Sequence, residues 1–211
     1  MDLLDLVSKG LGRDFATRVA NLTGESAPVS QCALDSALTL LLAGLARKAA
    51  TPEGAGDVLG LLDRHGTDPA QLANLAGLLS GNNLNSLASA GTTILAGLFG
   101  ERTQDIHGAL GSLSGIRPGS AATLLSVATP LALGLLRHHA SREGLGASGL
   151  ASLLQAQQEM LARRLPDGLA RSAGWGDPAD WFGAGHRAQV DGHRRDGPLR
   201  RLPWLRSLFL R

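Results

Sequence analysis

The chain has 211 residues, 44% of them hydrophobic, which is enough to build a core in one domain or in a fused pair of small ones. Only 3% are aromatic and Tyr is absent, so Leu and Ala supply nearly all the apolar surface, a mixture that favours helices over strands. The formal net charge is +2, and the single cysteine, Cys32, excludes an internal disulfide. We therefore predict an all-α protein whose fold does not depend on an oxidising compartment.

An internal repeat is the main organising feature and has to be interpreted before the individual helices. Residues 3–62 recur at 94–154, with the shift between the copies changing only in Gly/Ser/Pro-rich stretches that tolerate insertions. We predict a duplicated all-α domain at 1–170, folded as a compact orthogonal helical bundle, in which residues 63–93 connect the two copies.

A short amphipathic helix is predicted near the start of each copy. Its apolar positions are spaced i, i+4, i+7, which places them on one helix face. They are Phe15, Val19 and Leu22 in the first copy and Ile106, Leu110 and Leu113 in the second. Asp14 and Asp105 stand just ahead of these positions and are predicted to be N-caps.

The next helix of each copy, at about 29–50 and 120–140, is apolar on most of its circumference, which is typical of a buried helix. The uncharged stretch 119–136 approaches the ~20 apolar residues that a membrane span needs, but its counterpart, 36–46, is far too short. We therefore interpret both as buried helices. Pro130 is predicted to kink the second one, because an interior proline removes a backbone donor.

Further helices are predicted after the first long one. Thr51, Pro52 and Glu53 have the residue types of an N-cap, a first helical position and a first-turn acid. A short helix is predicted to begin at Thr67, and residues 80–91 (SGNNLNSLASAG) are predicted to form a flexible crossing segment and a candidate lid. One last helix is predicted at about 148–165.

The composition changes near residues 166–171, where we place a boundary. Residues 1–170 contain 12 Lys and Arg against 14 Asp and Glu, whereas residues 171–211 contain 8 Arg against 4 Asp. All three tryptophans and a high density of Gly and Pro lie in the second part. We predict a basic Trp/Arg/Gly-rich tail at 171–211 that is partly disordered.

Apolar and basic residues alternate at the end of this tail, as in a short helix with one apolar and one basic face. Such a segment can lie on an anionic membrane surface or bind in the groove of a partner protein. The candidate contact residues are Arg200, Arg201, Leu202, Trp204, Leu205, Arg206, Leu208 and Phe209. A disordered, soluble terminus is an equal interpretation. Nucleic acid is disfavoured as a partner, because four aspartates lie among the eight arginines.

Three sequence stretches resemble a known bacterial family. They are LLLAGLARKAATPEGAG, ILAGLFG, and SGI followed by ATLLSVATPLALGLL with its late proline. Together they resemble the YidB-like proteins, a widespread domain of unknown function, over roughly residues 1–165. The resemblance implies a small cytoplasmic α-helical domain with orthogonal packing and no assigned activity, and it supplies no functional residues.

The residues that carry chemistry form no recognisable site. His138 and His139 point about 100° apart on a helix and cannot both bind one ion, and no histidine pair has the i, i+4 spacing of a helical zinc site. Cys32 has no linked His or Asn and is predicted to be a buried small apolar residue. We predict no catalytic residue, no metal site and no cofactor.

Three hypotheses about function remain. The favoured one is a non-catalytic helical interaction module that binds an unknown protein partner or a second copy of itself. The second is a peripheral membrane protein anchored by the basic C-terminus, and the third is an enzyme or small-molecule binder at the groove between the copies. The expected location is the cytoplasm, or the inner membrane's surface in the second case, since residues 1–9 carry two aspartates and no long apolar stretch.

Overall fold

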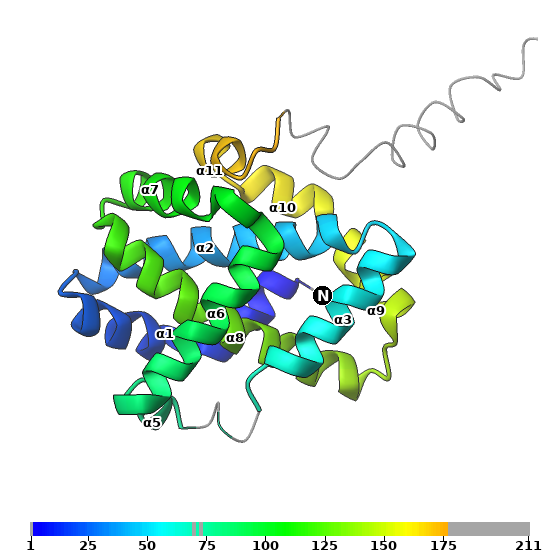
Figure 1. Ribbon diagram of the computed structural model, residues 1–211, viewed down its shortest axis with the longest axis horizontal. Helices are drawn as coiled ribbons and strands as arrows, with labels where there is room; N and C mark the ends of the chain where they lie inside the picture. The colour runs from blue at the N-terminus through cyan, green and yellow to red at the C-terminus, as the bar shows by residue number, and fades with distance from the viewer. Residues whose placement is uncertain (1, 69–70, 72–73, 177–211) are drawn as a thin grey trace, which may run out of the picture.

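The computed structural model describes residues 2–68, 71 and 74–176, and this part of the chain contains helices and no strands. The all-α prediction is confirmed. The helices are α1 (Leu3–Thr23), α2 (Ala27–Lys48), α3 (Pro52–His65), α5 (Leu75–Leu78), α6 (Gly81–Phe99), the 3₁₀ turn η1 (Gly100–Arg102), α7 (Thr103–Ser114), α8 (Pro118–Arg142), α9 (Ala147–Gln155), α10 (Gln158–Arg164) and α11 (Asp167–Ser172) (Figure 1).

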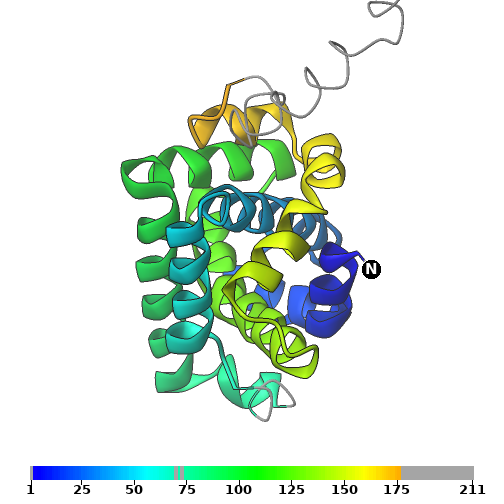
Figure 2. The same ribbon diagram turned by 90° about the vertical axis from the view of Figure 1, so that its right-hand side faces the viewer.

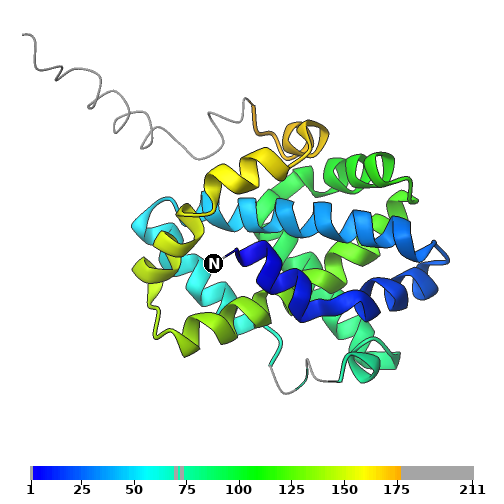
Figure 3. The same cartoon turned by 180° about the vertical axis from the view of Figure 1, so that it is seen from behind.

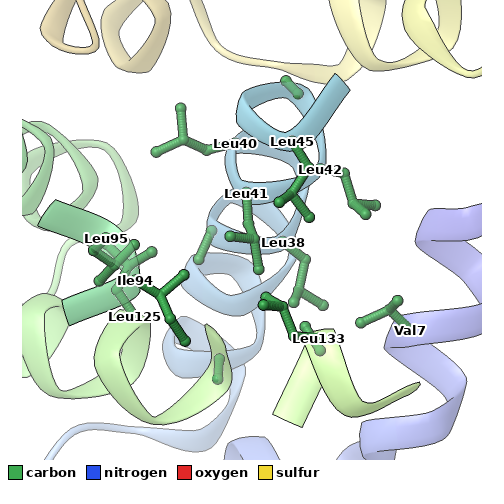
Figure 4. Close-up of a cluster of buried hydrophobic side chains, with 14 of the residues drawn as sticks. Val7, Leu38, Leu40, Leu41, Leu42, Leu45, Ile94, Leu95, Leu125 and Leu133 are labelled. Carbon is green, nitrogen blue, oxygen red and sulfur yellow. The ribbon is translucent and has the colours of Figure 1, made fainter. Parts of the chain in front are cut away.

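The two long apolar helices, α2 and α8, pack on each other at the centre of the fold. Leucines of α2 such as Leu38 and Leu41 meet Leu133 of α8, and side chains of α1 and α6 close the cluster around them (Figure 4). Leu40 and Leu42 are also buried, so α2 is covered on nearly every side. The prediction that both long helices are buried is confirmed.

Helices from both predicted copies pack against each of the two central helices. The first-copy helices α1 and α3 contact α8 as well as α2, and the second-copy helices α7 and α9 contact α2. Helix α6 crosses α8 on the face seen in Figure 1, and α1 lies on the opposite face, seen in Figure 3. The copies therefore share one contiguous core instead of forming two separate ones.

Equivalent positions of the two copies adopt similar conformations at one junction. Helix α1 ends at Gly24 with φ 70° and α7 ends at Gly115 with φ 72°, and each is followed by a long helix. A left-handed residue at this position favours glycine, because no Cβ is present to clash. The similarity agrees with the predicted duplication, which stays a prediction.

The first helices differ from expectation in their caps and exposed residues. Asp2, not Asp14, caps α1, accepting the N–H groups of Leu4 and Asp5, and Asp105 lies in the first turn of α7 instead of at its cap. The N-cap prediction for these two aspartates was wrong. The reason in α1 is that the helix starts earlier and continues through a kink at Gly12, which has φ 72°.

The third position of each predicted apolar face is also not buried. Phe15 and Val19 are fully buried, as are their equivalents in α7, but Leu22 and Leu113 are 47% and 49% exposed. Both leucines lie in the last turn of their helix, where neighbouring elements cover them only in part.

The start of α3 follows the sequence prediction. Thr51 is the N-cap and its side chain accepts the N–H of Gly54, Pro52 is the first helical residue, and Glu53 lies in the first turn. An added Cβ at Gly54 would lie 1.8 Å from the carbonyl oxygen of Lys48, so only glycine permits this tight approach of α3 to the end of α2.

The predicted flexible crossing segment at 80–91 was wrong, because residues 81–99 form the continuous helix α6. Asn, Ser and Gly have low intrinsic helix propensity. Burial overrides it here: Leu87, Gly91, Ile94 and Leu95 form a buried stripe at helical spacing against α8. Of the predicted short helix near Thr67, the structure describes helical residues at Gln71 and in α5, whereas residues 69–70 and 72–73, including Leu72, lie outside the described residues.

The contact between α6 and α8 is centred on the interior proline of α8. Because Pro130 has no N–H, the carbonyl oxygen of Ser126 does not receive the usual helical hydrogen bond. The backbone of α6 passes directly over this carbonyl at Gly91, where an added Cβ would lie 1.7 Å from the Ser126 oxygen. The connector also attaches at this turn, since the N–H of Thr67 donates to the carbonyl of Pro130 at 3.1 Å.

The C-terminal part of the fold extends further than predicted. The expected helix at 148–165 is divided into α9 and α10 around residues 156–157. The expected tail boundary at 171 falls within α11, which packs on α7, and Trp175 is only 8% exposed. Residues 177–211, which carry most of the predicted tail, lie outside the described residues.

Two described helices, α2 and α8, are long and apolar enough to cross a membrane. Within the fold, 72% and 78% of their most apolar windows are buried. Core helices of soluble proteins pass the same length and composition test, so this observation does not establish a membrane location.

Substitution of Gly91 tests the contact between α6 and α8. We expect Gly91→Ala to lower the free energy of unfolding by about 2 kcal/mol or more, because the new methyl group overlaps the Ser126 carbonyl. The matched control is Gly97→Ala on the same helix, where an added Cβ meets nothing within 4 Å. This change should stabilise the protein by up to about 1 kcal/mol. Urea unfolding measures both effects, and equal values would contradict the close approach.

Candidate functional site

The predicted contact residues, Arg200 to Phe209, lie outside the described residues, so the structure does not place them. It does show where the segment that carries them leaves the helical body. After α11 the chain turns at Gly174, which has φ 75°, and the N–H of Trp175 donates to the carbonyl of Ala170 at 2.9 Å. This turn directs the Trp175 side chain back onto the fold.

Trp175 occupies a niche formed by α2 and α6. Its ring lies 6.0 Å from the ring of Phe99, centroid to centroid, and the Arg47 guanidinium lies 5.1 Å from the Trp175 ring centroid. Burial lowers the pKa of Arg47 from its usual value. An aromatic pair and a partly desolvated cation–π contact each contribute on the order of 1 kcal/mol. The start of the C-terminal segment is therefore fixed to the body.

A small-residue position makes this niche possible. An added Cβ at Gly44 would lie 2.9 Å from the ring of Phe99, so the ring lies directly on the α2 backbone. Phe99 and Trp175 both belong to the hydrophobic core. The niche was not predicted from the sequence, although Gly44 and the Gly-Trp-Gly stretch at 174–176 are signals for it.

A mostly apolar hollow lies between α3 and α9, and we call it the α3–α9 groove. It lies at the end of the molecule that faces the viewer in Figure 2 and has a volume of about 490 Å³. Both predicted copies contribute to it. Its lining residues are Ala49, Ala50, Thr51, Pro52, Ala55, Ala147, Ser148, Ala151 and Gln155.

The lining of the α3–α9 groove is mostly methyl groups. Its polar groups are the hydroxyls of Thr51 and Ser148 and the amide of Gln155, and no titratable side chain lines it. Glu53 and Asp57 are exposed on the first turns of α3 next to this lining, and Asp57 pairs with Lys48 at 3.0 Å. The groove thus combines an apolar floor with acidic neighbours, which suits an apolar segment that carries cations.

A second hollow, of about 340 Å³, is polar and lies among α1, α2 and α10. It contains two carboxylates, Asp5 and Asp35, whose neighbours already engage them: Lys9 lies 3.3 Å from Asp5, and the Gln31 amide donates to Asp35 at 3.0 Å. Surface ion pairs of this kind contribute little stability. Among the described residues, no three His, Cys, Asp or Glu side chains are placed to hold a metal ion.

The residues that the sequence singled out for chemistry are not brought together. His138 and His139 lie in the last turns of α8, close to Glu143, the C-cap residue of that helix. His107 is buried in α7, its Nε2 atom has no hydrogen-bond partner, and burial lowers its pKa. The prediction that Cys32 is buried was wrong. Cys32 lies in the second turn of α2 and is exposed to solvent.

One cluster of polar and charged groups joins the end of α1 to the start of α8. Glu25, whose side chain is 15% exposed, accepts the backbone N–H of Arg117 at 3.1 Å, the Arg117 Nε–H at 3.0 Å and the Ser120 hydroxyl at 2.7 Å. Arg117 also donates to the carbonyl of Thr23 at the end of α1. The hydrogen bonds from Ser120 and Arg117 lower the pKa of Glu25 to about 2. The loop after α1 thereby caps the N-terminus of α8.

These features define an all-α protein with two buried central helices and an apolar end groove. A family model described as a bacterial protein of unknown function, DUF937, matches residues 5–139, from α1 to the last turns of α8. The chain belongs to this family. No curated protein and no solved structure matches the chain. The family model thus agrees with a bacterial domain of unknown function.

The Glu25 cluster makes a prediction about pH. Since the pKa of Glu25 is about 2 in the folded protein and 4.5 is its ordinary value, the unfolded chain binds more protons between these values. The contribution of Glu25 to stability is present above about pH 4.5 and is lost as the pH falls towards 2. We expect Glu25→Gln to be less stable than the wild type at pH 6, with the two stabilities converging at low pH.

The measurement is urea unfolding at pH 6, 4 and 3. Glu101→Gln is the control, because it removes an exposed carboxylate that makes none of these contacts. A difference between Glu25→Gln and the wild type that does not change with pH would contradict the role of the carboxylate charge.

Proposed function

We propose that this protein is a non-catalytic interaction module, in which a rigid helical body presents a basic C-terminal segment to a protein partner or to a second copy. The observation that carries the proposal is the fixed start of that segment. Trp175 is packed between Phe99 and Arg47 immediately before residues 177–211 begin. A segment fixed at its base reaches partners from a defined point on the surface.

The composition of the body supports the same proposal. The region where the copies meet is filled with leucine side chains at α2 and α8 (Figure 4), and the groove that both copies line contains no titratable side chain. An apolar groove with few polar groups is better suited to hold a peptide than to carry out acid–base chemistry. From the motifs described above we also propose that, within its family, the chain is YidB-like.

Charge reversal in the segment tests the proposal. We expect Arg200→Glu, Arg201→Glu and Arg206→Glu together to weaken self-association or partner binding at least about tenfold, because three favourable charges become repulsive. The matched control reverses Arg187, Arg194 and Arg195, which lie in the same segment before its apolar part. Light scattering and cross-linked affinity capture with the full chain provide the measurement. A monomer that captures nothing, or equal effects of the two triple variants, would contradict the proposal.

A second candidate function is peripheral membrane binding, which the sequence of the segment itself favours. Leu, Trp and Phe alternate with Arg at 200–211, as in helices that lie on anionic lipid. The same two triple variants discriminate this function from protein binding. Binding of the wild type to phosphatidylglycerol vesicles, but not to phosphatidylcholine vesicles, together with loss in the first triple variant, would support the membrane function.

A further inference from the structure

We propose that the apolar part of the C-terminal segment, residues 199–211, binds in the α3–α9 groove of its own chain. This inference deepens the proposed function, and rests on it, by naming where the segment is held when no partner engages it. Four observations support it: the chemistry of the groove, the point where the chain leaves the body, the charges of the two parts, and the side chains of the segment.

The groove has the shape and chemistry of a peptide site. Alanines from the turn after α2, from α3 and from α9 form most of its lining, so a bound backbone can approach closely and large side chains can enter. Its volume of about 490 Å³ lies in the range of ligand pockets. Ala55 and Ala151 are buried at its floor, whereas Pro52 and Ser148 at its rim are exposed.

The described chain ends against the last turn of α2, and the end of the same helix borders the groove. Trp175 is stacked on Arg47, which lies in that last turn, and the groove lining begins with Ala49, the C-cap residue of α2. The 22 residues between Gly176 and Leu199 can span up to about 70 Å, and a random-coil chain of that length has a typical end-to-end distance of about 25 Å. The segment can therefore reach the groove of its own chain without strain.

The charges of the two parts are complementary. Residues 177–211 contain 7 Arg and 4 Asp, and residues 1–176 contain 13 Lys and Arg against 14 Asp and Glu. Glu53 and Asp57 are exposed beside the groove on α3. Asp57 already pairs with Lys48, so Glu53 is the carboxylate that can meet an arginine of the segment.

The side chains of the segment complement a lining of small residues. Its sequence, LRRLPWLRSLFLR, starts a candidate helix at Pro203, and proline is favoured at the first helical position. A helix from this residue places Trp204 and Leu208, and likewise Leu205 and Phe209, four positions apart. These large apolar side chains suit a lining in which five of the nine residues are alanines.

Tethering favours binding within one chain. A segment joined to the body by a chain of this length has an effective concentration on the order of 1 mM at a site it can reach. A dissociation constant of about 0.1 mM is then enough to keep the groove about 90% occupied. A second copy would have to exceed this concentration to compete.

Hydrogen exchange of the full chain, followed by mass spectrometry, tests the inference. We expect the backbone amides at 147–155 and 52–58 to exchange about tenfold faster in the full-length variant Leu205→Glu/Leu208→Glu than in the wild type. Ser148→Trp, which fills the groove from an exposed position, should give the same increase. Ser89→Trp, an exposed serine on α6 outside the groove, is the matched control and should exchange like the wild type.

Three outcomes would overturn the inference. They are equal exchange in the wild type and Leu205→Glu/Leu208→Glu, equal effects of Ser148→Trp and Ser89→Trp, and protection that disappears when the protein is diluted. The last outcome would indicate binding between chains. Thermal unfolding and circular dichroism confirm that each variant is folded.

Partner capture tests the proposed function separately. The Ser148→Trp variant frees the segment from the groove and should still capture the partner. Failure of the groove inference is therefore distinguishable from failure of the proposed function.

Discussion

The rest of the structure depends on the need to cover two helices that are apolar all round. Neither α2 nor α8 has a polar face that can be left towards water, so each needs neighbours on nearly every side. The two helices cover one side of each other, and helices from both predicted copies cover the remaining sides. Helices from the N-terminal and C-terminal halves of the described chain therefore form a single core, and the groove and the Trp175 niche lie at its edges.

Glycines at the contact points allow neighbouring elements to pack closely around α2 and α8. Gly91 over the Ser126 carbonyl, Gly54 against Lys48 and Gly44 under Phe99 each remove a side chain where two elements meet. Two of these glycine contacts also shape the surface features to which we assign a function. The contact at Gly44 creates the niche for Trp175, and the contact at Gly54 brings the start of α3 against the end of α2, where the α3–α9 groove begins.

The sequence predicted the features that depend on local pattern and missed those that depend on tertiary context. The all-α class, the two buried helices and the cap at Thr51 follow from periodicity and residue type. Helix α6 was missed because its Asn, Ser and Gly residues have low propensity, and only its packing on α8 makes it helical. The groove could not be predicted, since it arises where residues almost 100 positions apart meet.

The central claim is that the two copies form one core and that neither is a folding unit alone. Circular dichroism and urea unfolding of the separate segments 1–80 and 81–211 test it most directly. Each segment alone should lack a cooperative transition, because its long helix would expose the side that the other copy covers, and mixing the segments should restore helix and a single transition. Cooperative unfolding of 1–80 by itself would contradict the claim.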